Sequence, residues 1–164
     1  RDLNNNSKNY HYWLQYAISR TVYGDFPPAD MCFQSSYSLY DKTKKNINDR
    51  HAMLDNHYAR FLMLRLTESS LRDEAFSDDF KEADSIVQRQ ISDDTTQHYP
   101  YRVILLYLSF YRKFEGLMSG DQHDYILARA KFYLHKIETL SDAMKNNRYV
   151  NDSRVALQGL LNGA

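Results

Sequence analysis

Apolar side chains recur every three or four residues along most of the chain, which is the spacing of one face of an α-helix. This pattern predicts six helices, over residues 7–24, 27–45, 48–67, 76–91, 100–117 and 119–140. We expect a weaker seventh helix after Asn151 or Ser153. Ser7 is the expected N-cap of the first helix and Gly24 its terminator, while segment 119–121 caps the sixth. Because no stretch alternates with the period of two of a half-buried strand, the sequence predicts an all-α fold of antiparallel helix pairs.

The amino-acid composition also indicates long helices connected by few turns. The chain of 164 residues holds 5 glycines and 3 prolines, below the usual share of about 7% and 5%. An all-β protein would need turn residues every ~8–12 positions, so that fold class is excluded. Aromatic residues make up 14% of the chain, which predicts a core built from large rings.

The equal numbers of acidic and basic residues limit the kinds of partner that we expect the protein to bind. Lysine plus arginine and aspartate plus glutamate both number 21, so nucleic acid is an unlikely ligand for lack of a broad basic field. The longest apolar run, 103–108, is far shorter than the ~20 residues of a membrane span. The single cysteine, Cys32, excludes an intrachain disulfide and fits a reducing compartment. We expect a cytoplasmic protein without membrane contact. Because the chain starts at Arg1, we expect one helical-repeat domain over residues 1–164, as a fragment of a larger multidomain protein.

Small and large side chains repeat at a spacing typical of the tetratricopeptide unit. Trp13 and Ala17 are followed by Ala29 and Phe33, and the step from Ala17 to Ala29 is twelve residues, as that unit requires. Alanine lacks bulk where two helix backbones cross, and the large rings fill the space beside the crossing. This spacing predicts a tetratricopeptide-like right-handed superhelix, with an irregular helical bundle as the alternative.

A second copy of the unit is stretched. Tyr58-Ala59 repeats the first small position, and Ala83 repeats the second. Their separation of 24 residues predicts about three extra helical turns or a loop between them.

Three strings carry a family resemblance: YWLQYAI at 12–18, DNHYARFL at 55–62 and HYPYRV at 98–103. Together they resemble the C-terminal helical-repeat region of bacterial STAND-class P-loop ATPases, some of which carry sirtuin-like effector domains and act in antiphage defence. The resemblance implies a sensor or autoinhibitory module within a larger switch protein. This chain lacks the G-x-x-x-x-G-K-[ST] phosphate loop, so nucleotide binding would belong to other segments of the parent.

Helical repeats have no chemistry of their own, so the leading hypothesis is a non-catalytic interaction module. Its partner would be a protein or peptide, or sibling domains of the parent chain, through which it could also oligomerise. We expect no cofactor and no metal. Polar and aromatic residues near two helix starts either tie these helices together or form a binding hot spot. The candidates are His57, Tyr58, Arg60, Tyr99, Tyr101 and Arg102.

The alternative hypothesis is an all-α ribonuclease of the HEPN type. Arg50 and His57 match the short Arg-x(4–6)-His motif, in which arginine would stabilise phosphate charge and histidine would move a proton. Such a centre requires both side chains in one open cleft.

Overall fold

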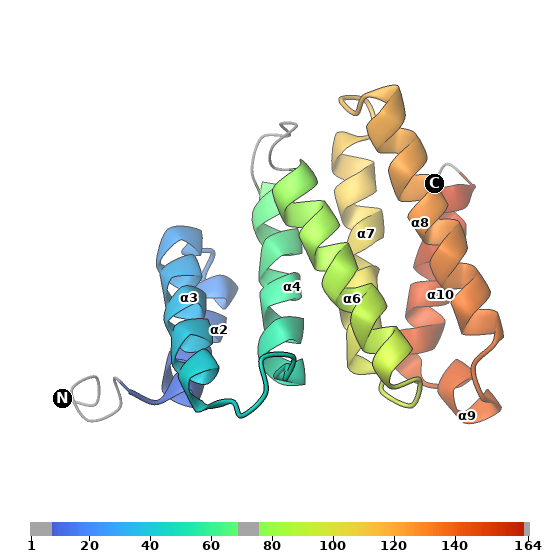
Figure 1. Cartoon of the computed structure of the whole chain (residues 1–164). Helices are drawn as coiled ribbons and strands as arrows, with labels where there is room; N and C mark the ends of the chain where they lie inside the picture. Colours follow the sequence, from blue (N-terminus) through green and yellow to red (C-terminus); the bar gives the residue numbers. More distant parts are fainter. Residues whose placement is uncertain (1–7, 69–75, 163–164) are drawn as a thin grey trace.

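The computed structural model describes residues 8–68 and 76–162, and within these ranges the chain is helical and holds no strand (Figure 1). This confirms the all-α prediction. The elements are α2 (Tyr10–Val22), α3 (Phe26–Thr43), α4 (Ala52–Glu68), the π-helical turn η1 (Phe76–Phe80), α6 (Lys81–Asp93), α7 (Tyr99–Phe114), α8 (Gly120–Glu138), α9 (Asp142–Lys145) and α10 (Arg148–Leu161). None of these helices is long and apolar enough to cross a membrane.

Local signals set most helix ends. Asn9 caps α2, since its side chain accepts a hydrogen bond from the His11 amide at 2.9 Å. The expected cap, Ser7, lies outside the described residues. Gly24 ends this region with a φ of 77°, a left-handed conformation that glycine adopts without steric cost. Ser119 is the N-cap of α8, which confirms the cap predicted at 119–121, and the structure shows a complete capping box with Gln122.

The last helix begins earlier than predicted. Asn147, rather than Asn151 or Ser153, caps α10 by accepting from the amides of Tyr149 and Val150. Ser153 lies inside the helix, fully buried, and donates to the Tyr101 carbonyl at 2.8 Å. Its hydroxyl therefore joins α10 to α7 and does not start a helix.

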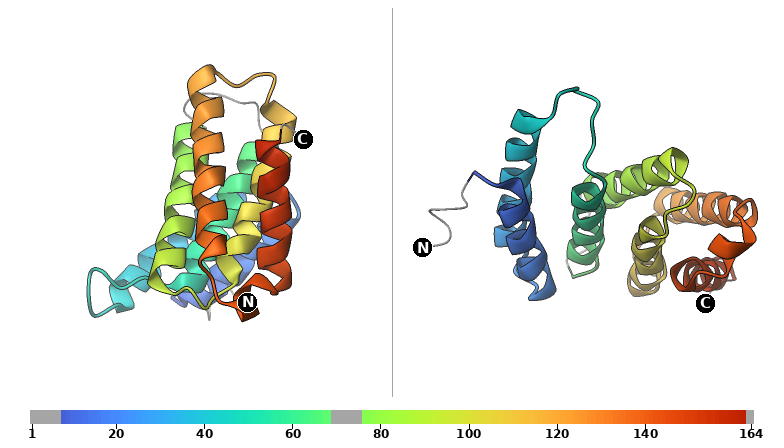
Figure 2. Two further views of the ribbon diagram at one scale, coloured as in Figure 1. Left: turned by 90° about the vertical axis from the view of Figure 1, so that its right-hand side faces the viewer. Right: turned by 90° about the horizontal axis from the view of Figure 1, so that it is seen from below.

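The helices pack side by side in one array. α2 and α3 form one hairpin, and α4 packs on both α6 and α7. α10 closes the array against α7 and α8. Seen from below, α4, α7 and α10 form one row and α6 and α8 a second row (Figure 2). This two-layered order is what helical repeats have, and the right-handed superhelix itself stays a prediction.

The small residues singled out by the repeat lie at buried positions. Ala17 and Ala29 are fully buried in the closely packed α2–α3 hairpin, with Phe33 fully buried on α3. Ala59 and Ala83 are equally buried on the packed pair α4 and α6. Trp13 is only half-buried, so it covers the edge of the core instead of filling its centre. The stretch between the second pair of alanines includes the remainder of α4 and the π-helical turn before α6.

A buried carboxylate joins three helices of the C-terminal half. Asp84 of α6 is 2% exposed and accepts hydrogen bonds from the hydroxyls of Tyr107 and Tyr133, each at 2.7 Å. Arg129 of α8 completes the group, with its Nε 2.6 Å from the carboxylate. Burial, followed by the nearby carboxylate, raises the pKa of Tyr133 far above its ordinary value, so the phenol remains a donor.

Replacing Phe33 with alanine is expected to lower the free energy of unfolding by about 3–5 kcal/mol, because it removes a fully buried ring and leaves a cavity. Its ring packs against Tyr58 and Phe61, with centroids 5.3 and 5.1 Å away. Denaturant titration measures the loss. Trp13→Ala is the comparison and should cost less, since Trp13 is half-buried. A loss below about 1 kcal/mol for Phe33→Ala would contradict its place in the core.

Candidate functional site

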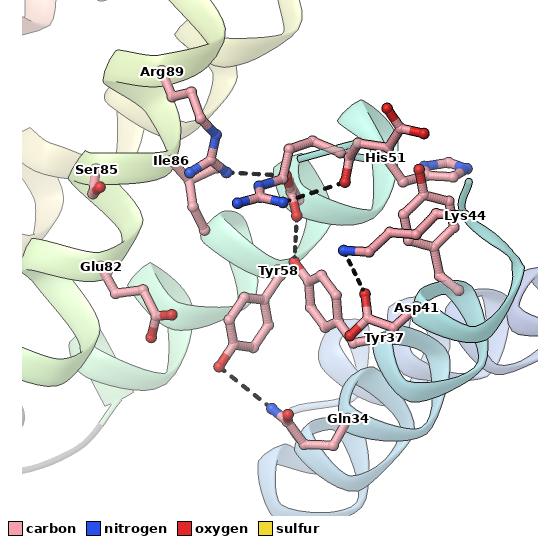
Figure 3. A pocket seen from close by; sticks show the side chains of 14 residues that line it. Gln34, Tyr37, Asp41, Lys44, His51, Tyr58, Glu82, Ser85, Ile86 and Arg89 are labelled. Carbon is pink, nitrogen blue, oxygen red and sulfur yellow. Dashed lines mark hydrogen bonds and ion pairs between the residues drawn. The ribbon is translucent and has the colours of Figure 1, made fainter. Parts of the chain in front are cut away.

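A cavity of about 390 Å³ lies between α3, α4 and α6 (Figure 3). We call it the α3–α4–α6 groove. Tyrosine and arginine, the residue types most enriched in interaction hot spots, contribute much of its lining. Its lining residues are Gln34, Tyr37, Tyr40, Asp41, Lys44, Asp49, Arg50, His51, Asp55, Tyr58, Glu82, Ser85, Ile86 and Arg89.

Asp55 organises one wall of the groove. Its carboxylate is 5% exposed and accepts from the Tyr37 hydroxyl at 2.7 Å and from Arg89 Nη2 at 3.0 Å. These contacts tie α4 to α3 on one side and to α6 on the other. Burial, and then the charge of Asp55, raise the pKa of Tyr37 far above its ordinary range, so this hydroxyl stays a hydrogen-bond donor.

Tyr58 contributes an aromatic surface beside this carboxylate. Its ring lies edge-on to Tyr37, with centroids 5.4 Å apart, and its hydroxyl is 3.5 Å from Gln34 Nε2. Burial raises the pKa of Tyr58 to about 12. On α6, burial and the neighbouring Asp79 raise the pKa of Glu82, which also lines the groove. The groove therefore offers a neutral phenol beside a carboxylate that takes up a proton more readily than usual.

The segment before α4 brings charged groups to the end of the groove. Arg50 donates to the backbone carbonyls of Ile47 and Asp49, and Lys44 pairs with Asp41 at 3.0 Å. His51 accepts from the Leu54 amide at 3.2 Å and so satisfies a donor at the start of α4.

A second hollow of about 340 Å³ adjoins the groove along α6. Ser85 and Arg89 line both hollows, and the second extends to Tyr125 and Arg129 of α8. The two together provide an extended polar and aromatic surface across α3, α4, α6 and α8.

The opposite side of α4 carries a different chemistry. His57 and Arg60 lie on this side, since they are about 200° and 140° around the helix from Asp55. Burial, then Arg102 of α7 and then Arg60 lower the pKa of His57. Burial and Arg102 likewise lower the pKa of Arg60. Geometry places them together: Asn56 of α4 bonds to the Tyr99 carbonyl of α7, the two helices start at the same end of the molecule (Figure 1), and Arg60 and Arg102 each lie one turn further along. We call this surface of His57, Arg60 and Arg102 the basic face.

The structure divides the predicted binding residues between several places. Tyr58 lines the groove, whereas His57, Arg60 and Arg102 form the basic face. The others contribute mainly to packing between helices. Tyr101 is buried, and burial raises its pKa to about 12. Tyr99 is half-buried, and its carbonyl accepts from Asn56 at 3.3 Å.

Sequence reasoning missed Tyr37, Asp55 and Arg89 as groove residues. The sequence did contain one indication of the position of Asp55. This residue lies on the same helical stripe as Tyr58 and Leu62, at spacings of three and four. A carboxylate on an apolar stripe indicates a buried acid with a partner from another helix.

Arg50 and His57 do not face the same cleft. Arg50 lines the α3–α4–α6 groove, whereas His57 lies on the basic face with Arg60 and Arg102. Among residues 8–68 and 76–162, no three histidine, cysteine, aspartate or glutamate side chains are grouped so as to hold a metal ion.

Comparison with models of protein families, with curated proteins and with solved structures gives no match to this chain. The resemblance to STAND-class proteins therefore rests on the three sequence strings alone.

The free energy of unfolding is expected to fall as the pH is lowered from about 7.5 to about 5.5. Because the pKa of His57 lies below its ordinary value of 6.5 in the folded chain, the unfolded chain takes up a proton more readily in this range. Arg60 and Arg102 are the charged neighbours that produce the effect beyond burial. Denaturant titrations at several pH values measure this slope.

His57→Gln should make the slope shallower without abolishing it. Glutamine does not titrate, whereas burial and then His11 still lower the pKa of His51. An unchanged slope in the variant would contradict the placement of a half-buried His57 near Arg60 and Arg102.

Proposed function

We propose that this chain is a non-catalytic interaction module that binds a segment of a partner protein in the α3–α4–α6 groove. The observation that carries the proposal is a groove lined with tyrosine and arginine, in which Asp55 holds Tyr37 and Arg89 at fixed positions. Tyrosine and arginine contribute disproportionately to binding energy when a partner excludes water from them.

Pre-organisation supports this proposal. Each flexible side chain that becomes ordered on binding costs about 0.5–1.5 kcal/mol. Tyr37 and Arg89 are already held by a buried carboxylate, so a partner meets them in one arrangement. The groove thus presents an ordered set of donors and aromatic rings.

The lining chemistry favours a mixed polar and aromatic peptide. Lys44 and Arg50 supply positive charge, whereas Asp49 and Glu82 supply negative charge. Such a lining can pair with both signs of charge, and the ring of Tyr58 offers apolar contact between them. The partner would be a segment of another protein or of a sibling domain.

The separation of Arg50 from His57 favours this module over the ribonuclease, since a ribonuclease would need both in one cleft. In the cytoplasmic bacterial switch protein that the family resemblance implies, binding across α3, α4 and α6 would act as the sensing step. A ligand shifts the balance between two conformations of a switch protein only if it binds one conformation more tightly than the other.

Blocking the groove tests the proposal. Ser85 is exposed on α6 and lines both hollows, so Ser85→Trp places a large side chain there without removing a lining contact. Ser109→Trp on α7 is the matched control, since Ser109 is exposed and lines neither hollow. Peptides selected from a random library on the wild-type chain are then titrated against both variants.

We expect these peptides to bind Ser109→Trp as they bind the wild type, and Ser85→Trp about tenfold more weakly or worse. Equal affinity for all three proteins, or a loss confined to Ser109→Trp, would show that the groove is not the binding surface. Circular dichroism establishes that each variant is folded.

A further inference from the structure

Within the described residues, Arg60 lacks the carboxylate partner that three other half-buried arginines have. Arg65 bonds to Asp79 at 2.9 Å, Arg89 to Asp55 at 3.0 Å and Arg129 to Asp84 at 2.6 Å. These carboxylates offset the cost of burying a guanidinium. Arg60 is half-buried as well, but no carboxylate of the described residues offsets its charge.

Arg60 makes no hydrogen bond or ion pair with any residue in 8–68 or 76–162. The charge that acts on it is another cation, Arg102. Arg102 in turn contacts the ring of Tyr149, with its Cζ 5.3 Å from the ring centre. His57 also has only these two arginines as charged neighbours among the described residues. Three basic side chains therefore meet without a negative charge between them.

A hollow beside Arg60 adds apolar surface to this charge. Its volume is about 580 Å³, and it lies between the turn that joins α2 to α3 and the outer side of α4. Glu68 is its acidic residue, but it lies two turns further along α4, roughly 12 Å from Arg60 along the axis. The remaining lining residues are Thr21, Val22, Gly24, Phe26 and Leu64.

We propose that the basic face binds an acidic segment of a partner protein, with a carboxylate side chain at Arg60 and Arg102 and an apolar side chain in the adjoining hollow. Guanidinium groups bind carboxylates with two parallel hydrogen bonds, and an incoming carboxylate would supply the missing counter-charge. This surface is on the opposite side of α4 from the α3–α4–α6 groove, and its occupancy does not depend on that groove.

The extent of the charge favours a peptide over a nucleic acid. Nucleic acids are bound mainly by many lysine and arginine contacts to successive phosphates. The basic face offers three basic side chains at one place, and the whole chain has a formal net charge of zero. Such a compact site suits one or two carboxylates.

The test uses a fluorescent peptide of alternating glutamate pairs and leucines, blocked at both ends, and a counterpart with glutamine in place of glutamate. Binding to the full chain is measured by anisotropy at low and high salt. Arg102→Gln and Arg60→Gln remove one positive charge each from the basic face. Lys131→Gln, at an exposed position on α8, is the control for the same change in net charge.

We expect the glutamate peptide to bind the wild type and Lys131→Gln equally, and each arginine variant about tenfold more weakly. Added salt should weaken the binding, and the glutamine peptide should bind at least about tenfold more weakly than the glutamate peptide. Equal binding of the two peptides, or equal binding to all four proteins, would overturn the proposal. Tighter binding of a single-stranded RNA, lost in Arg102→Gln, would also overturn it, since the site would then be one for nucleic acid.

Unfolding measurements separate binding from a structural role. Removing either arginine relieves their mutual repulsion, which for Arg102→Gln offsets the lost contact with the Tyr149 ring, so each glutamine variant should be about as resistant to denaturant as the wild type. Lower resistance in both variants would indicate that the arginines serve the fold and would overturn the proposal. Arg102 is exposed, so its variant keeps the binding test valid even where Arg60→Gln fails to fold.

Discussion

Buried carboxylates shared between helices fix this array. Asp55, Asp79 and Asp84 are each less than 7% exposed, and each accepts hydrogen bonds from side chains of other helices. A buried charge is tolerated only where such donors surround it, and loss of one donor leaves a charge that costs several kcal/mol. The helices therefore cannot slide or rotate independently, because a small shift would separate a carboxylate from a tyrosine or an arginine. Apolar packing alone, which is non-directional, would specify these positions less tightly.

The same constraint shapes the two candidate binding surfaces. In the α3–α4–α6 groove, Asp55 uses its hydrogen-bonding capacity to hold Tyr37 and Arg89, so the groove is ordered before any partner arrives. On the basic face no carboxylate performs this role for Arg60 among the described residues. The fold thus pairs its buried charges where they stabilise helix packing, and among the described residues it leaves the half-buried Arg60 without a carboxylate. Groups with perturbed pKa values cluster at sites that interact with ligands.

The sequence predicted the features that depend on local spacing. Periodicity located the main helices, the twelve-residue step identified Ala17 and Ala29 as buried positions, and Gly24 and the segment at Ser119 marked helix ends. The start of α10 was predicted wrongly because several residues there could cap a helix, and only tertiary packing shows that Ser153 bonds to α7. The pairing of Asp55 with Arg89 was beyond sequence reasoning, since their separation of 34 residues becomes a contact only when α4 and α6 pack. Adjacency in the chain was also a poor guide to which residues share a surface. His57 and Tyr58 are consecutive, but their side chains point about 100° apart around the helix.

Helix α4 explains why a short string can be distinctive without any catalytic residue. It packs on α6 and α7 and also contacts α2 and α3, so it has no wide solvent-exposed side. Neighbouring helices therefore restrict which residue types fit at most of its positions. Within the string at 55–62, Asp55 and Tyr58 face the groove, whereas His57 and Arg60 belong to the basic face. The remaining residues of the string are Asn56, Ala59, Phe61 and Leu62 on the packed surface, and all four are buried. The residue type at each position is thus determined by a different neighbour. The resulting mixture of polar and apolar residues does not follow a simple amphipathic pattern. The string at 55–62 is therefore the one in which both candidate surfaces meet, and its unusual composition follows from packing and surface chemistry acting on the same turns of one helix.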